Sequence, residues 1–182
     1  MTNLSDFTDD ELAPILDAPG AVLKGATLAD GRPGAVQFLK EMTSGARVFR
    51  EAQEHENDLV RSVALGMRER IKDQEAAGDR AAADPASQVG VRPAAATTEQ
   101  AARPDPAAGT ARAVEVAGAA VTLLRARGTE KDAVAYGEWL VRIAEEVAAA
   151  SGTKEGGFFS KRIKVSEGER AFIDRLTAAV EG

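Results

Sequence analysis

Cysteine is absent from this sequence of 182 residues, and histidine occurs once, as His55. The lack of cysteine excludes disulfides, thiolate zinc sites, cysteine-held iron–sulfur clusters and cysteine nucleophiles. The single histidine excludes the di-iron centre of helical bundles, which needs a histidine on each of two helices. A Ser-His-Asp triad could be built only around His55. We therefore predict no metal site and no cofactor.

Aromatic residues are also scarce, at 4%, although hydrophobic residues make up 44% of the chain. The core must then consist mainly of Ala, Val, Leu and Ile. Side chains of this kind suit closely packed helices better than a sheet, which favours β-branched and aromatic residues. No segment alternates apolar and polar residues for long enough to predict a strand. The predicted fold is an all-α bundle of about five to seven helices.

Long apolar runs are missing, since none approaches the roughly 20 residues that span a bilayer. The N-terminal MTNLSDFTDDE lacks the basic and apolar regions of a signal peptide. These features predict a cytoplasmic location without membrane insertion, and the Ala, Arg, Asp and Gly bias is typical of a bacterial genome. The net charge of −6 argues against nucleic-acid binding, which needs a basic face.

Near the N-terminus, a capping motif marks a helix start. Thr8 and Glu11 form an S/T-x-x-E capping box, which predicts a short helix that ends near Asp17. Pro19 is then expected in the first turn of a second helix, where its missing N–H has no intrahelical partner.

The region 36–76 carries apolar residues at spacings of three and four, the period of one helical face. The pattern becomes polar around residues 54–58. Either one bent helix spans the whole region, or two helices do, the second of them capped by Asn57 or Asp58.

Between residues 80 and 110 the composition changes. Four of the seven prolines lie here, and the only apolar residues larger than Ala or Pro are Val89 and Val91. Such a stretch cannot bury enough surface to offset the entropy lost on ordering. We expect a disordered, flexible Ala/Pro linker that divides the chain into helical segments 1–79 and 111–182, which pack into one bundle.

The C-terminal segment has the clearest helical pattern. Thr129 is expected to cap a helix with Asp132 in its first turn, and Ser166 with Glu169 forms a second capping box. The first of these helices has an apolar stripe at spacings of four, three and four, which predicts its core face. That stripe consists of Tyr136, Leu140, Ile143 and Val147.

The loop 154–165 between these two helices combines a glycine pair, two aromatic residues and several basic residues. One interpretation is a helix connector, in which glycine permits positive φ and the apolar side chains close the end of the helical pair. The alternative is an anion or partner site beside the positive end of the helix that begins at Ser166. A metal loop is a third alternative, although the ligand ladder of an EF-hand is absent. The candidate partner- or anion-binding residues are Phe158, Phe159, Lys161, Arg162 and Lys164.

Trp139, the single tryptophan, is a further candidate partner residue. It lies one position off the main stripe, so it either covers the edge of the bundle or is exposed as a hot spot. A metal could also bind the acidic cluster of Glu51, Glu54, His55, Glu56 and Asp58, of which Glu51 and His55, at i and i+4, share a helical face. A solvated helix surface explains the same residues, and we adopt that interpretation. Glu138, Glu145 and Glu146 are likewise assigned to the solvated side of their helix.

Residues 136–182 contain an apolar helix, then KEGGF, a short basic stretch, VS-x-x-E and a terminal amphipathic helix. This order resembles small all-helical bacterial proteins without a characterised function. More loosely, it is similar to the helix–loop–helix element of tellurite-resistance TerB-like domains. The resemblance covers about a quarter of the chain and implies an all-helical fold. The acidic positions associated with metal in TerB-like domains cannot be matched here residue by residue, so it implies no site residues.

Two functional hypotheses of different classes follow. The first is a non-catalytic protein-interaction or assembly module, which fits the missing catalytic signature, the long linker and a core that self-association would complete. The second, from the resemblance and the 154–165 loop, is a metal- or anion-responsive stress module. A carboxylate-dependent enzyme is a third, because acid–base chemistry needs only two carboxylates. No such pair stands out, so we expect a protein partner or self-association and no enzymatic activity.

The linker assignment predicts where a protease cuts first. Limited trypsin digestion should cleave at Arg80, Arg92 or Arg103 and leave two fragments that remain associated, because an extended backbone fits a protease active site and a packed one does not. Mass spectrometry of the early products checks this. Protection at all three sites would show that the segment is packed.

Overall fold

The computed structural model describes residues 2–31, 47–83, 105–151, 153–154 and 163–182, and it describes only the backbone of 74–83, 151, 153–154 and 163–164. Residues 47–52 are helical. The other elements, in chain order, are η1 (Leu4–Asp6), α1 (Asp9–Leu28), α3 (Asp58–Ala83), α4 (Pro106–Arg127), α5 (Glu130–Ser151), β1 (Thr153–Lys154), β2 (Ile163–Lys164) and α6 (Glu167–Glu181). The all-α prediction is confirmed.

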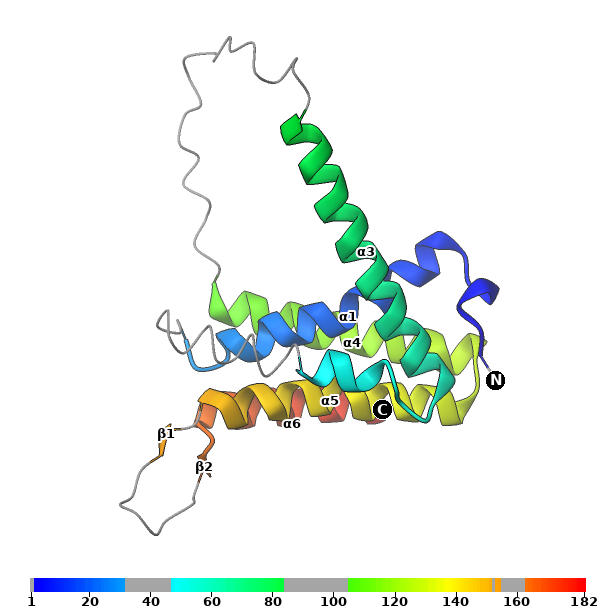
Figure 1. Cartoon of the computed structure of the whole chain (residues 1–182). Coiled ribbons are helices and arrows are strands. Elements are labelled where there is room, and N and C mark those ends of the chain that lie inside the picture. The colour runs from blue at the N-terminus through cyan, green and yellow to red at the C-terminus, as the bar shows by residue number, and fades with distance from the viewer. Residues whose placement is uncertain (1, 32–46, 84–104, 152, 155–162) are drawn as a thin grey trace.

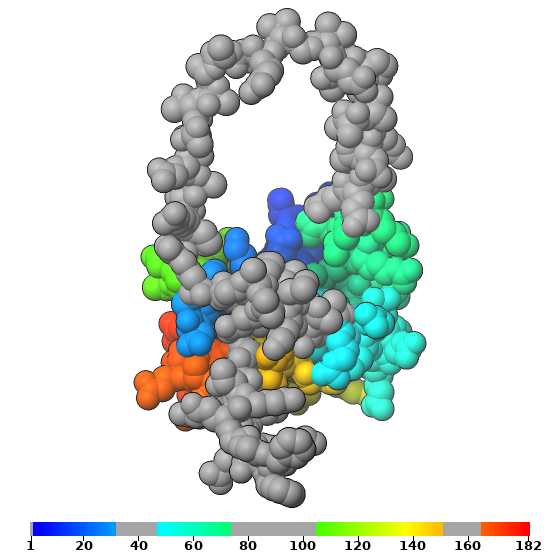
Figure 2. Space-filling view, turned by 60° about the vertical axis from the view of Figure 1, so that its left-hand side comes forward, coloured from blue at the N-terminus to red at the C-terminus, as the bar shows by residue number. Residues whose placement is uncertain are grey.

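Two pairs of helices form the body of the molecule. α1 lies along α4, and α5 lies along α6, with each pair packed on the other (Figure 1). α3 begins against α1 and α5 and then projects away from the bundle. In the space-filling view, α3 and residues 47–52 lie together on one side, and the start of α4 and the start of α6 lie on the other (Figure 2). The core therefore draws on both the N-terminal and the C-terminal segments.

Small residues bring α1, α4 and α6 into close contact. Ala18 and Val22 of α1, like Ala117 of α4, are fully buried. At Gly25, an added Cβ would lie 2.6 Å from the Cβ of Ala113 and 3.0 Å from the ring of Phe172. A contact this short leaves no room for a side chain, so glycine is required where the three helices meet. This packing explains how so few aromatic residues suffice.

The C-terminal helices follow the sequence pattern closely. All four residues of the predicted stripe on α5 are fully buried, which confirms it as a core face. Thr129 Oγ1 accepts the N–H of Asp132 at 3.2 Å, and Ser166 Oγ accepts the N–H of Glu169 at 3.1 Å. Both predicted caps are therefore present, because each motif acts within a single helical turn.

α1 differs from the prediction. The capping box at its start is present, with the N–H of Thr8 donating to the Glu11 carboxylate at 2.9 Å. However, the helix does not end near Asp17; it continues to Leu28 with Pro14 and Pro19 inside it. The expectation of a second helix starting at Pro19 is wrong. A proline inside a helix normally leaves the carbonyl four residues earlier without its donor, and tertiary structure supplies a replacement here.

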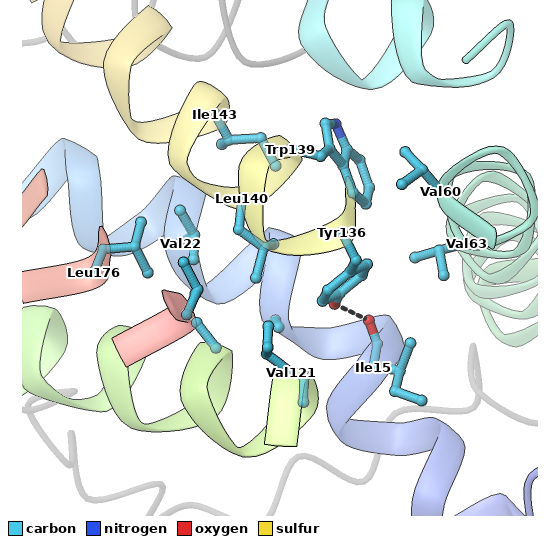
Figure 3. Packing of buried hydrophobic residues seen from close by; sticks show 14 of the residues in the cluster. Ile15, Val22, Val60, Val63, Val121, Tyr136, Trp139, Leu140, Ile143 and Leu176 are labelled. Carbon is cyan, nitrogen blue, oxygen red and sulfur yellow. Dashed lines mark hydrogen bonds between the residues drawn. The ribbon is translucent and has the colours of Figure 1, made fainter. Parts of the chain in front are cut away.

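The replacement donor for the Ile15 carbonyl is Tyr136 of α5. Pro19 has no N–H to offer, and the Tyr136 hydroxyl donates to this oxygen at 2.6 Å (Figure 3). Tyr136 is fully buried. Burial, together with the negative charge of Asp17, raises the pKa of Tyr136 well above its usual value, so the hydroxyl stays protonated and remains a donor. The long-range hydrogen bond thus satisfies a backbone group inside the core.

The region 36–76 contains a break rather than one bent helix. The helical turns at 47–52 end before α3 begins at Asp58. Asn57 caps α3, because its Oδ1 accepts the N–H groups of Leu59 and Val60 at 3.0 and 3.1 Å. Residues 36–46 lie outside the described residues.

The predicted linker, residues 80–110, overlaps a described helix at each end. Residues 80–83 belong to α3, and residues 106–110 belong to α4. α4 begins early because Asp105 accepts the N–H of Ala107 at 3.0 Å and Pro106 occupies the first helical position. Residues 84–104 lie outside the described residues.

Between α5 and α6 the structure contains a short antiparallel ladder that the sequence did not predict. Thr153 pairs with Lys164, and Lys154 pairs with Ile163. Two residues per strand are too few for an alternating pattern to be visible. The ladder fixes both ends of the 155–162 segment at one end of the α5–α6 pair.

The Tyr136–Ile15 bond predicts a double-mutant result. Tyr136→Phe should cost about 1–3 kcal/mol of unfolding free energy, because it leaves a buried carbonyl without a donor. In a Pro19→Ala background the cost should shrink, since alanine at this position supplies the missing backbone N–H. Urea denaturation of the four proteins measures the coupling. If Tyr136→Phe lowered the unfolding free energy equally in both backgrounds, the hydroxyl would not be replacing the backbone N–H that Pro19 lacks.

Candidate functional site: the groove between α5 and α6

A groove runs along the outer side of α5 and α6. It encloses a cavity of about 410 Å³, within the size range of ligand-binding clefts. Its apolar lining includes Val134, Val141 and Val180, and Val134 is 42% exposed. Apolar surface open to water and surrounded by polar groups is typical of an interaction site.

Close packing of the two helices forms the floor of this groove. At Gly137 an added Cβ would lie 3.2 Å from the Cβ of Val180. The absence of a side chain at residue 137 lets α6 approach α5 and leaves Val134 and Val141 on either side of the contact. The groove therefore depends on a small residue in the middle of an otherwise bulky helix face.

The rim of the groove is acidic. Glu130, Glu138 and Glu181 line it, against the single guanidinium of Arg125. Arg125 is already engaged, because it donates to the carbonyls of Val180 and Glu181, both at 3.1 Å, and its Nε lies 3.4 Å from Glu130. It thus caps the end of α6, where a cation is favourable. The rim is left with a surplus of negative charge around an apolar floor.

The other concentrated polar feature is a buried network centred on Asp132. This carboxylate is 6% exposed and accepts the N–H and hydroxyl of Thr2 at 2.9 and 2.7 Å, the Thr129 hydroxyl at 2.8 Å and the Asn57 amide at 2.8 Å. Burial alone raises a carboxyl pKa, but the hydrogen bonds outweigh burial and hold the pKa of Asp132 well below its usual value. Because Asn57 also caps α3, Asp132 joins the starts of α3 and α5 to the N-terminal residues. We assign it a structural role.

The suspected metal pair, Glu51 and His55, has other partners. Glu51 accepts from Arg142 at 2.6 Å and pairs with Arg47 at 3.3 Å. The Nδ1 of His55 accepts the N–H of Asn57 at 3.0 Å. Within the described parts of the chain, no group of three or more His, Asp and Glu side chains is placed to hold a metal ion.

The structure describes few of the predicted site residues. Phe158, Phe159, Lys161 and Arg162 lie outside the described residues, and Lys164 is described only as part of the β2 backbone. Their role as a partner or anion site stays a prediction.

Trp139 is not an exposed hot spot. It is 3% exposed, and its ring packs edge-on against Phe49 at 5.8 Å between centroids and against Tyr136 at 5.9 Å. The hypothesis of exposure is wrong because the helical residues 47–52 pack over this side of α5. That packing joins segments far apart in the sequence, so the stripe on α5 alone could not predict it.

Sequence reasoning also missed the groove. Glu138 is exposed, as expected for the solvated side of α5. The same side carries Val134, Gly137 and Val141, at spacings of three and four. This second, narrower apolar stripe was the available signal, and the stronger core stripe on the opposite side obscured it.

Two other helices present notable apolar surface. On α3, Leu65 and Ile71 are 42% and 54% exposed, and Ile71 lies beside the Arg70–Asp17 ion pair, where α3 leaves α1. By length and composition, α4 is the one described helix that could cross a membrane. The buried core helix of a soluble protein has the same properties, and α4 packs its Ala117 and Val121 into the core.

Comparison with protein-family models, curated proteins and solved structures finds no match to this chain. The similarity to TerB-like domains therefore stays a prediction.

The Asp132 network predicts how stability depends on pH. A carboxyl whose pKa is lower in the folded than in the unfolded state stabilises the fold above the unfolded value, about 3.9. That contribution should be lost as the pH falls below about 4. Asp132→Asn should therefore lower the free energy of unfolding by about 2 kcal/mol at pH 7. The difference in unfolding free energy between the variant and the unmodified protein should become smaller in acid.

Chemical denaturation at pH 7 and at pH 3 checks this, with Asp174→Asn on the exposed surface of α6 as the control. A difference that stays constant between the two pH values would show that Asp132 is not held ionised by the network.

Proposed function

We propose that this chain is a non-catalytic protein-interaction module and that its α5–α6 groove binds a basic segment with apolar anchors. The observation that carries this proposal is the combination of an exposed apolar floor, centred on Val134, with the acidic rim of Glu130, Glu138 and Glu181. The cytoplasmic location expected from the sequence belongs to the same proposal.

The physical chemistry of the groove favours a partner of this kind. Val134 and Val141 gain about 25 cal/mol for each Å² of apolar surface that a partner covers. The rim carboxylates attract cations from a distance and select against acidic partners. An anion would meet repulsion at the same place. The expected partner thus combines aromatic or aliphatic side chains with nearby Lys or Arg.

Other polar groups of the described chain support a non-catalytic role. Asp132 accepts four hydrogen bonds, and the Nδ1 of His55 accepts one from the backbone. Groups engaged in this way hold the fold together. A metal- or anion-responsive function would rest on the 154–165 loop, most of which lies outside the described residues.

A labelled peptide tests the proposal. A short fluorescent peptide with two Phe and three Lys residues should bind the full chain, and the same peptide with Glu in place of Lys should not. Glu138→Lys should weaken binding about tenfold, since it turns attraction at the rim into repulsion. The effect should fade as salt rises. Fluorescence anisotropy measures all of these.

Glu115→Lys is the matched control, because it makes the same charge change on the exposed surface of α4. Equal affinity for the two peptides, or equal weakening by Glu115→Lys, would argue against the groove as the binding site.

A further inference from the structure

We infer that the segment that fills the α5–α6 groove is residues 155–164 of a second copy of this chain, so that copies associate head to tail. This inference rests on the proposed function, since it uses the same groove. It goes further by naming the partner and the part of the partner that binds.

The two surfaces are complementary in charge. The groove holds three carboxylates against one guanidinium, and Arg125 is occupied by the end of α6. The segment 155–164 has the reverse composition, with Lys161, Arg162 and Lys164 against Glu155. Few other short stretches of this acidic chain carry such a surplus of positive charge. Opposite surpluses of this size steer encounter and fix the orientation of binding.

The two surfaces are also complementary in polarity. Phe158 and Phe159 directly precede the cations of the segment, and aromatic side chains are the usual anchors of protein interfaces. The groove offers them Val134 and Val141 in a cavity of about 410 Å³. The segment therefore has the apolar anchors and the cations that the proposed function requires of a partner.

The position of the segment prevents it from filling the whole groove within one copy. The β1–β2 ladder holds both ends of the segment beyond Ser151, at the far end of α5 from Glu130 (Figure 1). At 1.5 Å per residue, Ser151 lies about 20 Å from Glu138 and about 32 Å from Glu130. Nine chain steps between the paired ends allow an excursion of about 15 Å at most. The segment therefore cannot reach Val134 and Glu130, the far part of the groove, in its own copy.

A contact between different surfaces leaves each copy with one free groove and one free segment. Such heterologous contacts form rings or open chains rather than symmetric dimers. We therefore expect the average mass to rise with protein concentration in steps of one copy. High salt should reverse this rise, because the contact depends on charge.

A charge-swap experiment with the full chain tests the inference. The segment variant carries Lys161→Glu and Arg162→Glu, and the groove variant carries Glu138→Lys and Glu181→Lys. Each variant alone then presents like charges on both surfaces, so its association should weaken about tenfold or more. In an equimolar mixture both kinds of contact pair opposite charges, so association should return. Sedimentation velocity at low salt measures the masses.

Several outcomes separate the inference from the proposed function. If the mixture stays monomeric while each variant keeps its melting temperature, the inference is wrong. If the unmodified chain is monomeric at high concentration but binds the Phe/Lys peptide, the partner is another protein and only this inference fails. If the peptide does not bind either, both fail. Restored association in the mixture, absent when either variant is measured alone at the same total concentration, would establish the contact.

Discussion

The hydrogen bond from Tyr136 to the carbonyl of Ile15 is the interaction on which the rest of the fold depends. It lets α1 pass through Pro19 without leaving a buried carbonyl unsatisfied. Because α1 continues, its second half reaches α4 and α6, with Gly25 against Ala113. A helix that stopped at Asp17 would leave α4 without most of its packing partner. One hydroxyl group on α5 thus supports the contact between the two layers.

The same arrangement explains where the groove lies. α5 packs against α1, α3, α4 and α6, and the helical residues 47–52 cover Trp139. Only a narrow strip of α5 remains open to solvent, and it includes Val134 and Glu138. The central helix of the bundle is therefore also the helix that offers an interaction surface. Any partner that binds there contacts the element to which the rest of the core is attached.

Local features of this fold could be predicted from the sequence, and long-range ones could not. The caps at Thr129 and Ser166 and the stripe on α5 act within one or two helical turns, so their patterns are visible in the chain. The continuity of α1 depends on Tyr136, which lies 121 residues from Ile15, and no local pattern around Pro19 reveals it. Predicting the groove would have required knowing that α6 lies along Gly137, which no local pattern indicates. The predicted aromatic and basic site falls on residues that the structure does not describe.

The close approach at Gly25 has a consequence for how this sequence can change over evolutionary time. Where two helix backbones lie this close, the loss of a methyl group leaves only a small void. An added methyl group cannot be accommodated, because the Cβ of Ala113 is fixed to its backbone and cannot rotate away. At this point of the contact between α1 and α4, substitutions by larger residues are therefore excluded, while the loss of a methyl group is tolerated. Homologous sequences would be expected to keep glycine at residue 25 and small residues around it, while varying freely on the outer faces of the same helices.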